Sequence, residues 1–270
     1  MTSSVSTTPF YRESGYKRRV STAISVDHLD FRYPAKISES VNDQPLVLSD
    51  LTLSVPAGAR CLLVGANGAG KTTLLYLLAG RYLVAPERVR VLGCAAFHDT
   101  SLTTRRSFLG GLFPLDVDIT VREILDRQLD VEPARKQRLL QLLDIDLGWR
   151  MHRVSDGQRR RVQVLLGLLR PCEVLLLDEV TTDLDVIARA DLLAFLREES
   201  EQRGMTIVYA THIFDGLDAW ATHLLHLSHG KLRLLDELPK IGELSELRQA
   251  GESSPLLRLV ERRLRRDARP

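Results

Sequence analysis

Cysteine is scarce in this sequence of 270 residues, and its placement excludes two kinds of site. The three cysteines, Cys61, Cys94 and Cys172, lie far apart and form no CxxC pair. Disulfide frameworks and zinc sites need closely spaced cysteines, so neither is expected here. A reducing compartment is therefore favoured.

Long hydrophobic runs are absent as well. No uninterrupted apolar stretch reaches about 18 residues, so the chain is not expected to span a membrane by itself. Residues 1–20 are rich in Ser, Thr and basic side chains and lack an apolar core, which argues against a secretory signal. The net charge is only +2, so composition gives no indication of a nucleic-acid partner.

The order of apolar segments predicts an α/β fold with a mainly parallel core sheet. Several short apolar runs have the length and composition of buried parallel strands. They are residues 61–64, 174–177 and 206–210. Two earlier segments, 24–31 and 47–55, flank a polar loop and predict an antiparallel β subdomain. Helical periodicity from 121 to 170 predicts an inserted helical subdomain at about 108–170.

The two ends of the chain differ from this central domain, which is placed at 22–238. Residues 1–21 are interpreted as a flexible tail. Residues 239–270 have a helical pattern and end in a cluster of arginines, which predicts a basic helical C-terminal tail. A solvated amphipathic helix is the preferred interpretation, and a helix that binds a partner or nucleic acid is the alternative.

A glycine-rich turn between a predicted strand and a predicted helix carries the pattern GxxxxGK[ST]. Its glycines let backbone N–H groups point toward a phosphate, and the helix N-terminus adds positive dipole at the same point. Lys71 is expected to reach the β and γ phosphates, and Thr72 to offer its hydroxyl to Mg²⁺. The predicted nucleotide-binding residues of this turn are Gly65, Asn67, Gly68, Ala69, Gly70, Lys71, Thr72 and Thr73.

Two carboxylates follow the apolar run at 174–177. The carboxyl end of a parallel strand faces the ligand crevice, so Asp178 is predicted to hold Mg²⁺ together with Thr72. Glu179 is predicted to act as the general base that polarises the attacking water. Such a strand end is a weak signal alone, but beside the phosphate-binding turn it predicts ATP hydrolysis.

Four further motifs make the sequence resemble the ABC ATPase family over about residues 24–238. The segment VSDGQ at 154–158 is similar to the family signature, usually LSGGQ, and TDLD at 182–185 is similar to the D-loop. His212 follows a buried strand, as the switch histidine of the family does. Tyr33 resembles the aromatic residue that stacks on adenine.

This resemblance implies a P-loop NTPase fold, ATP and Mg²⁺ as ligands, and an ATP-dependent homodimer. In the family the signature faces the nucleotide of a second copy, so Ser155, Gly157 and Gln158 are expected to bind ATP there. Asp185 is expected to assist, although Ser155 and Asp185 could also cap their helices. The implied catalytic residues are Lys71, Glu179 and His212.

The sequence departs from the family pattern at two places. No glutamine occurs between Lys71 and Gln128, and the family's glutamine position falls near Gly110-Gly111. That glutamine normally couples the site to a transport partner, so its absence weakens a transporter interpretation. Asp156 replaces a signature glycine, and Val180 replaces a proline. We hypothesise that one of the arginines at 159–161 neutralises Asp156.

A narrower resemblance comes from AFHDT at 96–100, SDGQ at 155–158 and DEVTTDLD at 178–185. These segments are similar to soluble, stand-alone eukaryotic ABC proteins linked to the Not-type deadenylase and transcription-regulatory complex. The leading hypothesis is an ATPase of a regulatory assembly, cytoplasmic or also nuclear. The alternatives are a transporter's nucleotide-binding subunit with separate membrane subunits, and a nucleotide-gated scaffold with negligible turnover.

Two histidine features allow more than one interpretation. His98 and Asp99 could replace the missing glutamine as Mg²⁺ partners, although local hydrogen bonding is preferred. The spacing of His223, His226 and His229 suggests a metal site. Strand positions three apart point to opposite faces, so a structural role is preferred for them.

Overall fold

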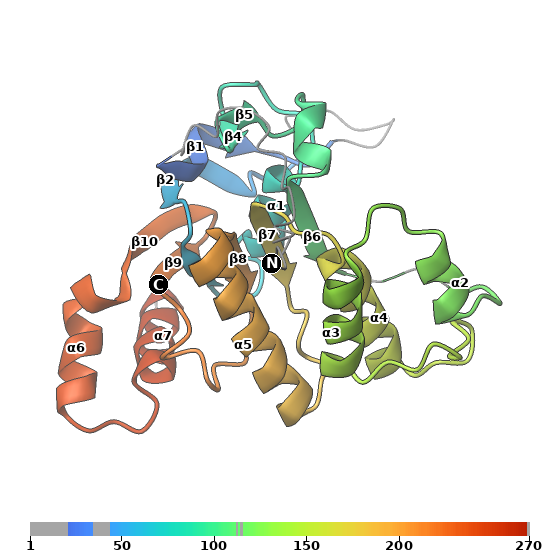
Figure 1. The fold of residues 1–270 in the computed structure, drawn as a ribbon. Helices are drawn as coiled ribbons and strands as arrows, with labels where there is room; N and C mark the ends of the chain where they lie inside the picture. The colour runs from blue at the N-terminus through green and yellow to red at the C-terminus, as the bar shows by residue number, and fades with distance from the viewer. Residues whose placement is uncertain (1–20, 35–43, 112, 114–115, 269–270) are drawn as a thin grey trace, which may run out of the picture.

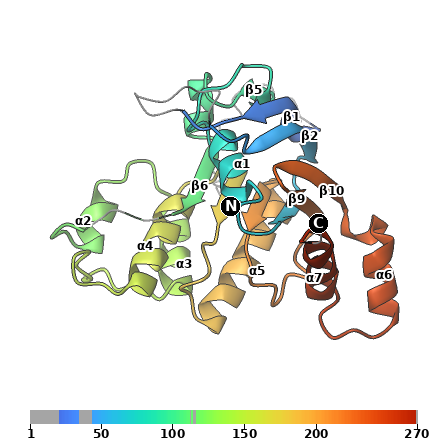
Figure 2. The ribbon, with the colours of Figure 1, turned by 180° about the vertical axis from the view of Figure 1, so that it is seen from behind.

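The computed structural model describes residues 21–34, 44–111, 113 and 116–268, which form two β-sheets with helices around them (Figure 1). The predicted N-terminal tail, apart from its last residue, lies outside the described residues. Figure 2 shows the same arrangement from behind, with the antiparallel strands above and the helices below.

The central sheet has six strands, in the order β10-β9-β3-β8-β7-β6. All neighbours pair in parallel except β10 and β9, which form an antiparallel hairpin. The strands are β3 (Arg60–Val64), β6 (Arg106–Gly110), β7 (Val174–Asp178), β8 (Thr206–Ala210), β9 (His223–Ser228) and β10 (Lys231–Glu237). This confirms the mainly parallel sheet. However, residues 108–110 belong to β6 and not to the helical subdomain, whose predicted start was therefore too early.

Side chains of the central strands alternate between two hydrophobic cores. On β3, Leu62 and Val64 face one core, whereas Cys61 and Leu63 face the other. The same alternation occurs on β7 and β8, where every residue is buried. A strand covered on both faces needs a continuous apolar run, which is why these segments could be recognised in the sequence.

One face of the central sheet is covered by a second, antiparallel sheet and by helix α1 (Lys71–Leu78). This sheet has the order β2-β1-β4-β5 and confirms the predicted β subdomain. Its strands are β1 (Thr22–Phe31), β2 (Leu48–Pro56), β4 (Val89–Val91) and β5 (Cys94–Ala95), and the short helix η2 (Thr100–Thr103) follows them.

The other face is covered by helices. The inserted subdomain contains α2 (Val121–Asp126), α3 (Pro133–Leu142) and α4 (Asp156–Leu168), which lie at the right in Figure 1. Helix α5 (Val186–Arg203) crosses beneath the middle of the sheet (Figure 1). Its Leu192, Phe195 and Leu196 are at most 2% exposed, so α5 shares its core with α4.

The C-terminal segment is helical, as predicted, but it packs against the domain and is not a solvated tail. It contains η3 (Leu238–Lys240), α6 (Gly242–Gln249) and α7 (Pro255–Asp267), at the left in Figure 1. Leu256, Leu259 and Val260 of α7 are at most 2% exposed and join the helix-side core. The arginine-rich face of α7 remains outward, with Arg262 and Arg265 exposed.

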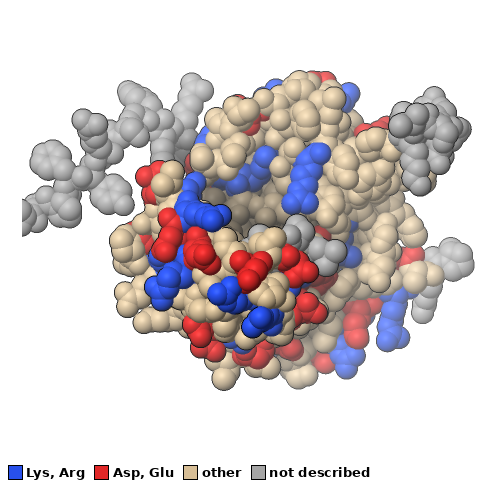
Figure 3. Space-filling model, turned by 90° about the vertical axis from the view of Figure 1, so that its right-hand side faces the viewer, with Lys and Arg blue, Asp and Glu red and all other residues tan. Residues whose placement is uncertain are grey.

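Within the described residues, no helix has the length and apolar character that crossing a membrane requires. Figure 3 shows the side of the molecule that bears α2, where basic and acidic side chains are intermixed. This face therefore presents no field of a single sign, in agreement with the small net charge.

Candidate functional site

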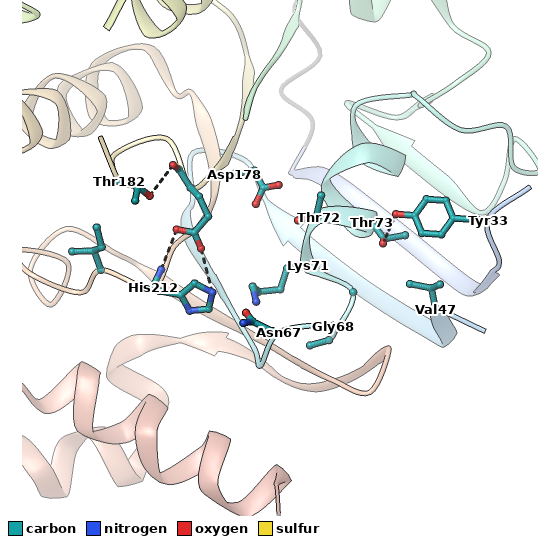
Figure 4. A pocket seen from close by; sticks show the side chains of 14 residues that line it. Tyr33, Val47, Asn67, Gly68, Lys71, Thr72, Thr73, Asp178, Thr182 and His212 are labelled. Atoms are coloured by element: carbon teal, nitrogen blue, oxygen red, sulfur yellow. Dashed lines mark hydrogen bonds and ion pairs between the residues drawn. The ribbon is translucent and has the colours of Figure 1, made fainter. Parts of the chain in front are cut away.

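A cavity of about 840 Å³ lies where the carboxyl ends of β3, β7 and β8 meet the N-terminus of α1 (Figure 4). Its walls contain most of the residues predicted for nucleotide binding and catalysis. They are Tyr33, Asn67, Gly68, Ala69, Gly70, Lys71, Thr72, Thr73, Asp178, Glu179 and His212. Segments far apart in the sequence thus converge at the edge of the parallel sheet, as the strand-end argument predicts.

The glycine-rich turn forms the floor of this cavity. Gly70 has φ +99° directly before α1, and a Cβ there would lie 2.6 Å from a methyl carbon of Leu48, so only glycine fits. Lys71 donates from Nζ to the carbonyl oxygens of Gly65 (2.7 Å) and Ala66 (3.1 Å). The lysine therefore already lies along the turn. Gly65 contacts Lys71 through its carbonyl oxygen but does not itself line the cavity.

Burial lowers the pKa of Lys71, while the nearby carboxylates Glu179 and Asp178 act in the opposite direction. The side chain is only 9% exposed. A cation held among carbonyl oxygens and carboxylates, at the N-terminus of a helix, is well placed to meet phosphate oxygens.

Asp178 is the last residue of β7 and is 8% exposed. In Figure 4 its carboxylate is drawn next to Thr72 at the start of α1. A carboxylate and a hydroxyl are the oxygen ligands that Mg²⁺ prefers, and both line the cavity. The donor set at this place therefore fits a Mg²⁺ ion held by Thr72 and Asp178.

Glu179 has a positive φ of +53°, which turns the chain sharply after β7. Its backbone N–H donates to the carbonyl oxygen of Ala210 (2.9 Å), and its own carbonyl accepts from the hydroxyl of Thr182 (3.1 Å). A non-glycine residue in this conformation is strained, and such strain is typical of functional sites. Burial raises the pKa of the Glu179 carboxyl, which His212 partly counteracts.

His212 reaches Glu179 in two ways. Its backbone N–H donates to Oε2 of Glu179 (3.4 Å), and its Nε2 lies 3.3 Å from Oε1 (Figure 4). The imidazole is about half exposed, at 51%. The predicted base and the predicted switch histidine are thus in direct contact at the open side of the cavity.

Tyr33 lies at the opposite end of the cavity (Figure 4). Its hydroxyl and that of Thr73 are 2.8 Å apart, and its ring packs edge-on against Phe31 and Tyr82. Val47 lines the cavity beside it. An aromatic ring and an apolar side chain at the end of the cavity away from the phosphate-binding turn could accommodate a nucleotide base.

The signature residues do not line the cavity. Ser155 caps α4: its hydroxyl accepts from the N–H of Gln158 (3.2 Å), and the Gln158 side chain accepts from the N–H of Ser155 (3.0 Å). Ser155 nevertheless remains exposed. A Cβ on Gly157 would lie 2.9 Å from the carbonyl oxygen of Asp183, so α4 packs closely on the segment 182–185.

Asp185 caps α5, accepting from the N–H groups of Ile187 (3.0 Å) and Ala188 (2.9 Å). The hydrogen bond from the N–H of Ala188 is the largest of the effects that lower the pKa of Asp185. The nearby guanidinium of Arg161 and the N–H of Ile187 act in the same direction. The capping role considered for Ser155 and Asp185 is therefore real. It leaves a further role toward a second copy as a prediction.

The three arginines at 159–161 make ion pairs elsewhere than at Asp156. Arg159 lies 3.8 Å from Asp116, Arg160 lies 3.3 Å from Asp183, and Arg161 lies near both Asp144 and Asp185. These ion pairs tie α4 to the neighbouring loops, and the neutralisation of Asp156 by one of the arginines stays a prediction.

Gly110 and Gly111 stand near the position where the family has its glutamine, and their backbone carbonyls accept hydrogen bonds from side chains of α4. Gln163 donates to the carbonyl of Gly110 (3.4 Å), and Arg160 donates to that of Gly111 (3.0 Å). His98 and Asp99 do not line the cavity, and their hydrogen bonds are local, as preferred. His98 lies 3.0 Å from the carbonyl of Val84, and Asp99 accepts from the N–H of Ser101 (2.9 Å).

The histidines of β9 have separate environments. His223 lies 2.9 Å from the hydroxyl of Thr222, whereas His226 is buried and lies 2.9 Å from Asp267 of α7. Burial lowers the pKa of His226, and Asp267 counteracts this. His226 thus belongs to the contact between the sheet and α7.

Sequence reasoning missed three residues of the cavity wall: Val47, Thr182 and Ile213. Thr182 lay inside the segment that resembles a D-loop, and Ile213 directly follows His212. Both could have been proposed as neighbours of predicted residues. Val47 carries no chemical signal, so only its position beside Tyr33 in the fold reveals it.

The pattern of the ABC transporter family matches residues 48–182. "ABC transporter I family member 20" of Arabidopsis thaliana is 46% identical over 264 residues, covering 93% of this chain and 78% of that protein. "CCR4-associated factor 16" of Saccharomyces cerevisiae is 43% identical over 229 residues, covering 78% and 77%. The chain therefore belongs to the ABC transporter family and is an ATP-binding ABC cassette.

Solved structures show the same fold. A dimeric bacterial ABC transporter cassette superposes with a TM-score of 0.65 at 19% identity, covering 80% of this chain and 98% of that one. An ATP-binding subunit of an ABC transporter gives a TM-score of 0.69 at 23% identity, covering 90% and 99%. At these identities the likeness concerns the fold, a mixed α/β P-loop NTPase cassette.

Proposed function

We propose that this chain hydrolyses ATP within a dimer that encloses two nucleotides, and that it acts in a regulatory assembly and not as part of a membrane pump. The supporting observation is the convergence of Lys71, Thr72, Asp178, Glu179 and His212 in one cavity. Tyr33 at its far end would contact the base.

In this proposal each residue has a distinct task. The N–H groups of the glycine-rich turn and Lys71 bind the phosphates, and the Glu179 carboxylate accepts the proton of the attacking water. His212 binds the terminal phosphate and orients Glu179, with which it is in contact. A Mg²⁺ ion on Thr72 and Asp178 would neutralise charge on the phosphates.

The second copy is needed because Ser155, Gly157 and Gln158 lie outside the cavity of their own chain. An exposed serine at a helix N-terminus is suited to contact an anion that another molecule presents. Two solved structures of a cassette with this fold are dimers, one of them with ADP and phosphate bound.

Two observations favour a regulatory assembly. A relative with 43% identity is named as a factor associated with CCR4, and we extend such an association to this chain. In addition, the glutamine that normally couples the site to a transport partner is missing near residues 110–111. The alternative, the nucleotide-binding subunit of a transporter, would be supported by co-purification with a polytopic membrane protein.

The ATPase rate of Glu179→Gln tests the proposed hydrolysis. We expect a loss of about a hundredfold or more, because a general base contributes that much. Glu87→Gln, an exposed carboxylate outside the cavity, should keep the wild-type rate. Equal rates for wild type and Glu179→Gln would refute catalysis by Glu179. Undiminished nucleotide binding by Lys71→Ala would refute the assignment of the cavity.

A further inference from the structure

Arg189 is a buried cation on the first turns of α5 with little counter-charge. It is only 9% exposed. Its Nη1 lies 3.5 Å from the carboxylate of Asp215, which is itself 93% exposed to solvent. Among the described residues, Nε of Arg189 is buried without a hydrogen-bond partner. Burying a guanidinium in this way is costly unless hydrogen bonds compensate for the hydration that it loses.

Those hydrogen bonds go to the turn that follows His212. Nη2 of Arg189 donates to the carbonyl oxygens of Ile213 (3.0 Å) and Asp215 (2.9 Å). The N–H of Ile213 is taken in turn by the hydroxyl of Thr211 (3.1 Å). Ile213, directly after His212, is thus held by both Thr211 and Arg189, and the same guanidinium holds Asp215.

We infer that Arg189 is a positioning residue for the hydrolysis proposed above, holding the 211–215 turn so that His212 meets Glu179. This inference rests on the proposed function. Arg189 does not line the cavity and therefore acts through His212, whose contacts with Glu179 are long, at 3.3 and 3.4 Å. Contacts of that length are sensitive to any loosening of the turn.

The fork of the guanidinium explains why arginine suits this position. Nη2 donates to both carbonyl oxygens of the turn, while Nη1 of the same planar group lies 3.5 Å from the carboxylate of Asp215. Lysine would keep the charge, but its single ammonium would have to serve both the carbonyls and the carboxylate. Glutamine of similar length would lose both the charge and the fork.

A double-mutant cycle with His212→Ala tests this role. Arg189→Gln should lower kcat roughly ten- to hundredfold through misplacement of His212. KM and the affinity for ADP should change less than about twofold, because the cavity wall is intact. In the His212→Ala background the same substitution should change kcat by less than about twofold, because the two residues act as a unit.

Arg197→Gln is the matched control, since Arg197 lies on the same helix, pairs with Glu201 at 2.8 Å and is 51% exposed. It should keep the wild-type kcat. An unchanged kcat for Arg189→Gln would overturn the inference, as would an equal loss in both backgrounds. If Arg189→Gln fails to fold, Arg189→Lys replaces it. This variant should lose less than about tenfold in kcat, and the loss should again disappear in the His212→Ala background. An equal loss of kcat with and without His212 would contradict the inference.

The outcome also separates this inference from the proposal on which it rests. If the wild-type protein showed no ATP turnover that depends on Glu179, both the positioning role of Arg189 and the proposed function would be overturned. Turnover that depends on Glu179 but not on Arg189 would leave the proposed function standing and remove only the positioning role.

Discussion

Glu179 combines two features that rarely occur together in a structural residue. It has a positive φ of +53°, and its carboxyl is buried enough for the pKa to rise above the ordinary value of 4.5. A base with a raised pKa binds the proton of water more strongly than an exposed glutamate does. The strained turn after β7 therefore positions a carboxylate that is suited to general-base catalysis.

This shift predicts the acidic limb of the pH profile. Catalysis needs the ionised form, so kcat should fall as pH drops through the raised pKa, above 4.5. His212 lowers the pKa of Glu179, so His212→Ala should move the limb to higher pH. Measuring kcat between about pH 4.5 and 8 for both proteins checks the direction. A limb at or below the ordinary value, or a shift to lower pH, would contradict the assignment.

Gly110 shows how a residue without a side chain shapes the metal-binding wall. It pairs with Asp178 across β6 and β7, and a Cβ there would lie 2.6 Å from Cβ of Asp178. Gly110→Ala should displace Asp178 and destabilise the protein by about 1–3 kcal/mol through overpacking. Urea unfolding and the Mg²⁺ dependence of the ATPase rate measure these effects.

Gly242→Ala serves as the control for this substitution, because a Cβ at Gly242 meets no atom within 4 Å. It should leave both quantities unchanged. Unaltered stability and Mg²⁺ dependence in Gly110→Ala would show that β6 can move away from Asp178 without consequence.

Most of the cavity could be predicted from the sequence because its chemistry is local. Lys71 and Thr72 belong to one continuous turn, and Asp178 and Glu179 directly follow an apolar strand. The sequence does not predict which residues outside the motifs the fold brings to the cavity. Val47 lines the wall, and Arg189 contacts the turn after His212, only because of tertiary packing.

Among the elements, the continuous apolar strands were predicted and β6 was not. The sequence RSFLG of β6 is short and has polar residues at its start, because its side chains there are only half buried. The C-terminal helices show the reverse case. Their amphipathic pattern predicts that one face of each helix is buried. The pattern does not show that this face packs against the core of the same domain.

The packing of α7 predicts a large loss of stability on truncating its apolar face. Leu259 is fully buried, at 0% exposure, in the core that also contains β9 and α5 residues. Leu259→Ala should lower the free energy of unfolding by about 2–5 kcal/mol. Arg262→Ala on the exposed face should change it by less than about 0.5 kcal/mol. Equal, small effects in urea unfolding would mean that α7 is a solvated tail after all.

At the scale of the whole molecule, the proposed dimer requires each chain to present two halves of a site on separate surfaces. The cavity lacks the signature residues, and Ser155 is exposed away from it. Next to Asp185, Val186 and Ile187 are 85% and 74% exposed, which is unusual for adjacent β-branched residues on a helix. Both features are accounted for if a second copy covers this surface when ATP is bound.

Mixing two inactive variants tests this arrangement directly. Lys71→Ala disables the phosphate turn of its own chain, and Ser155→Arg disables the signature that serves the other chain. Neither homodimer has an intact composite site, but a mixed dimer has one, formed by Lys71 of one copy and Ser155 of the other. An equal mixture should therefore regain roughly a quarter of the wild-type ATPase rate, since half of the dimers are mixed and each has one good site.

Recovery of activity on mixing cannot arise if each chain completes its own site, because every chain in the mixture then carries a disabling change. A mixture as inactive as its components, under conditions where the wild type dimerises, would therefore place Ser155 in the site of its own chain or in none. Mixing Lys71→Ala with Glu179→Gln is the matched control. Both residues lie in one cavity, so the mixed dimer contains no intact site and should stay inactive.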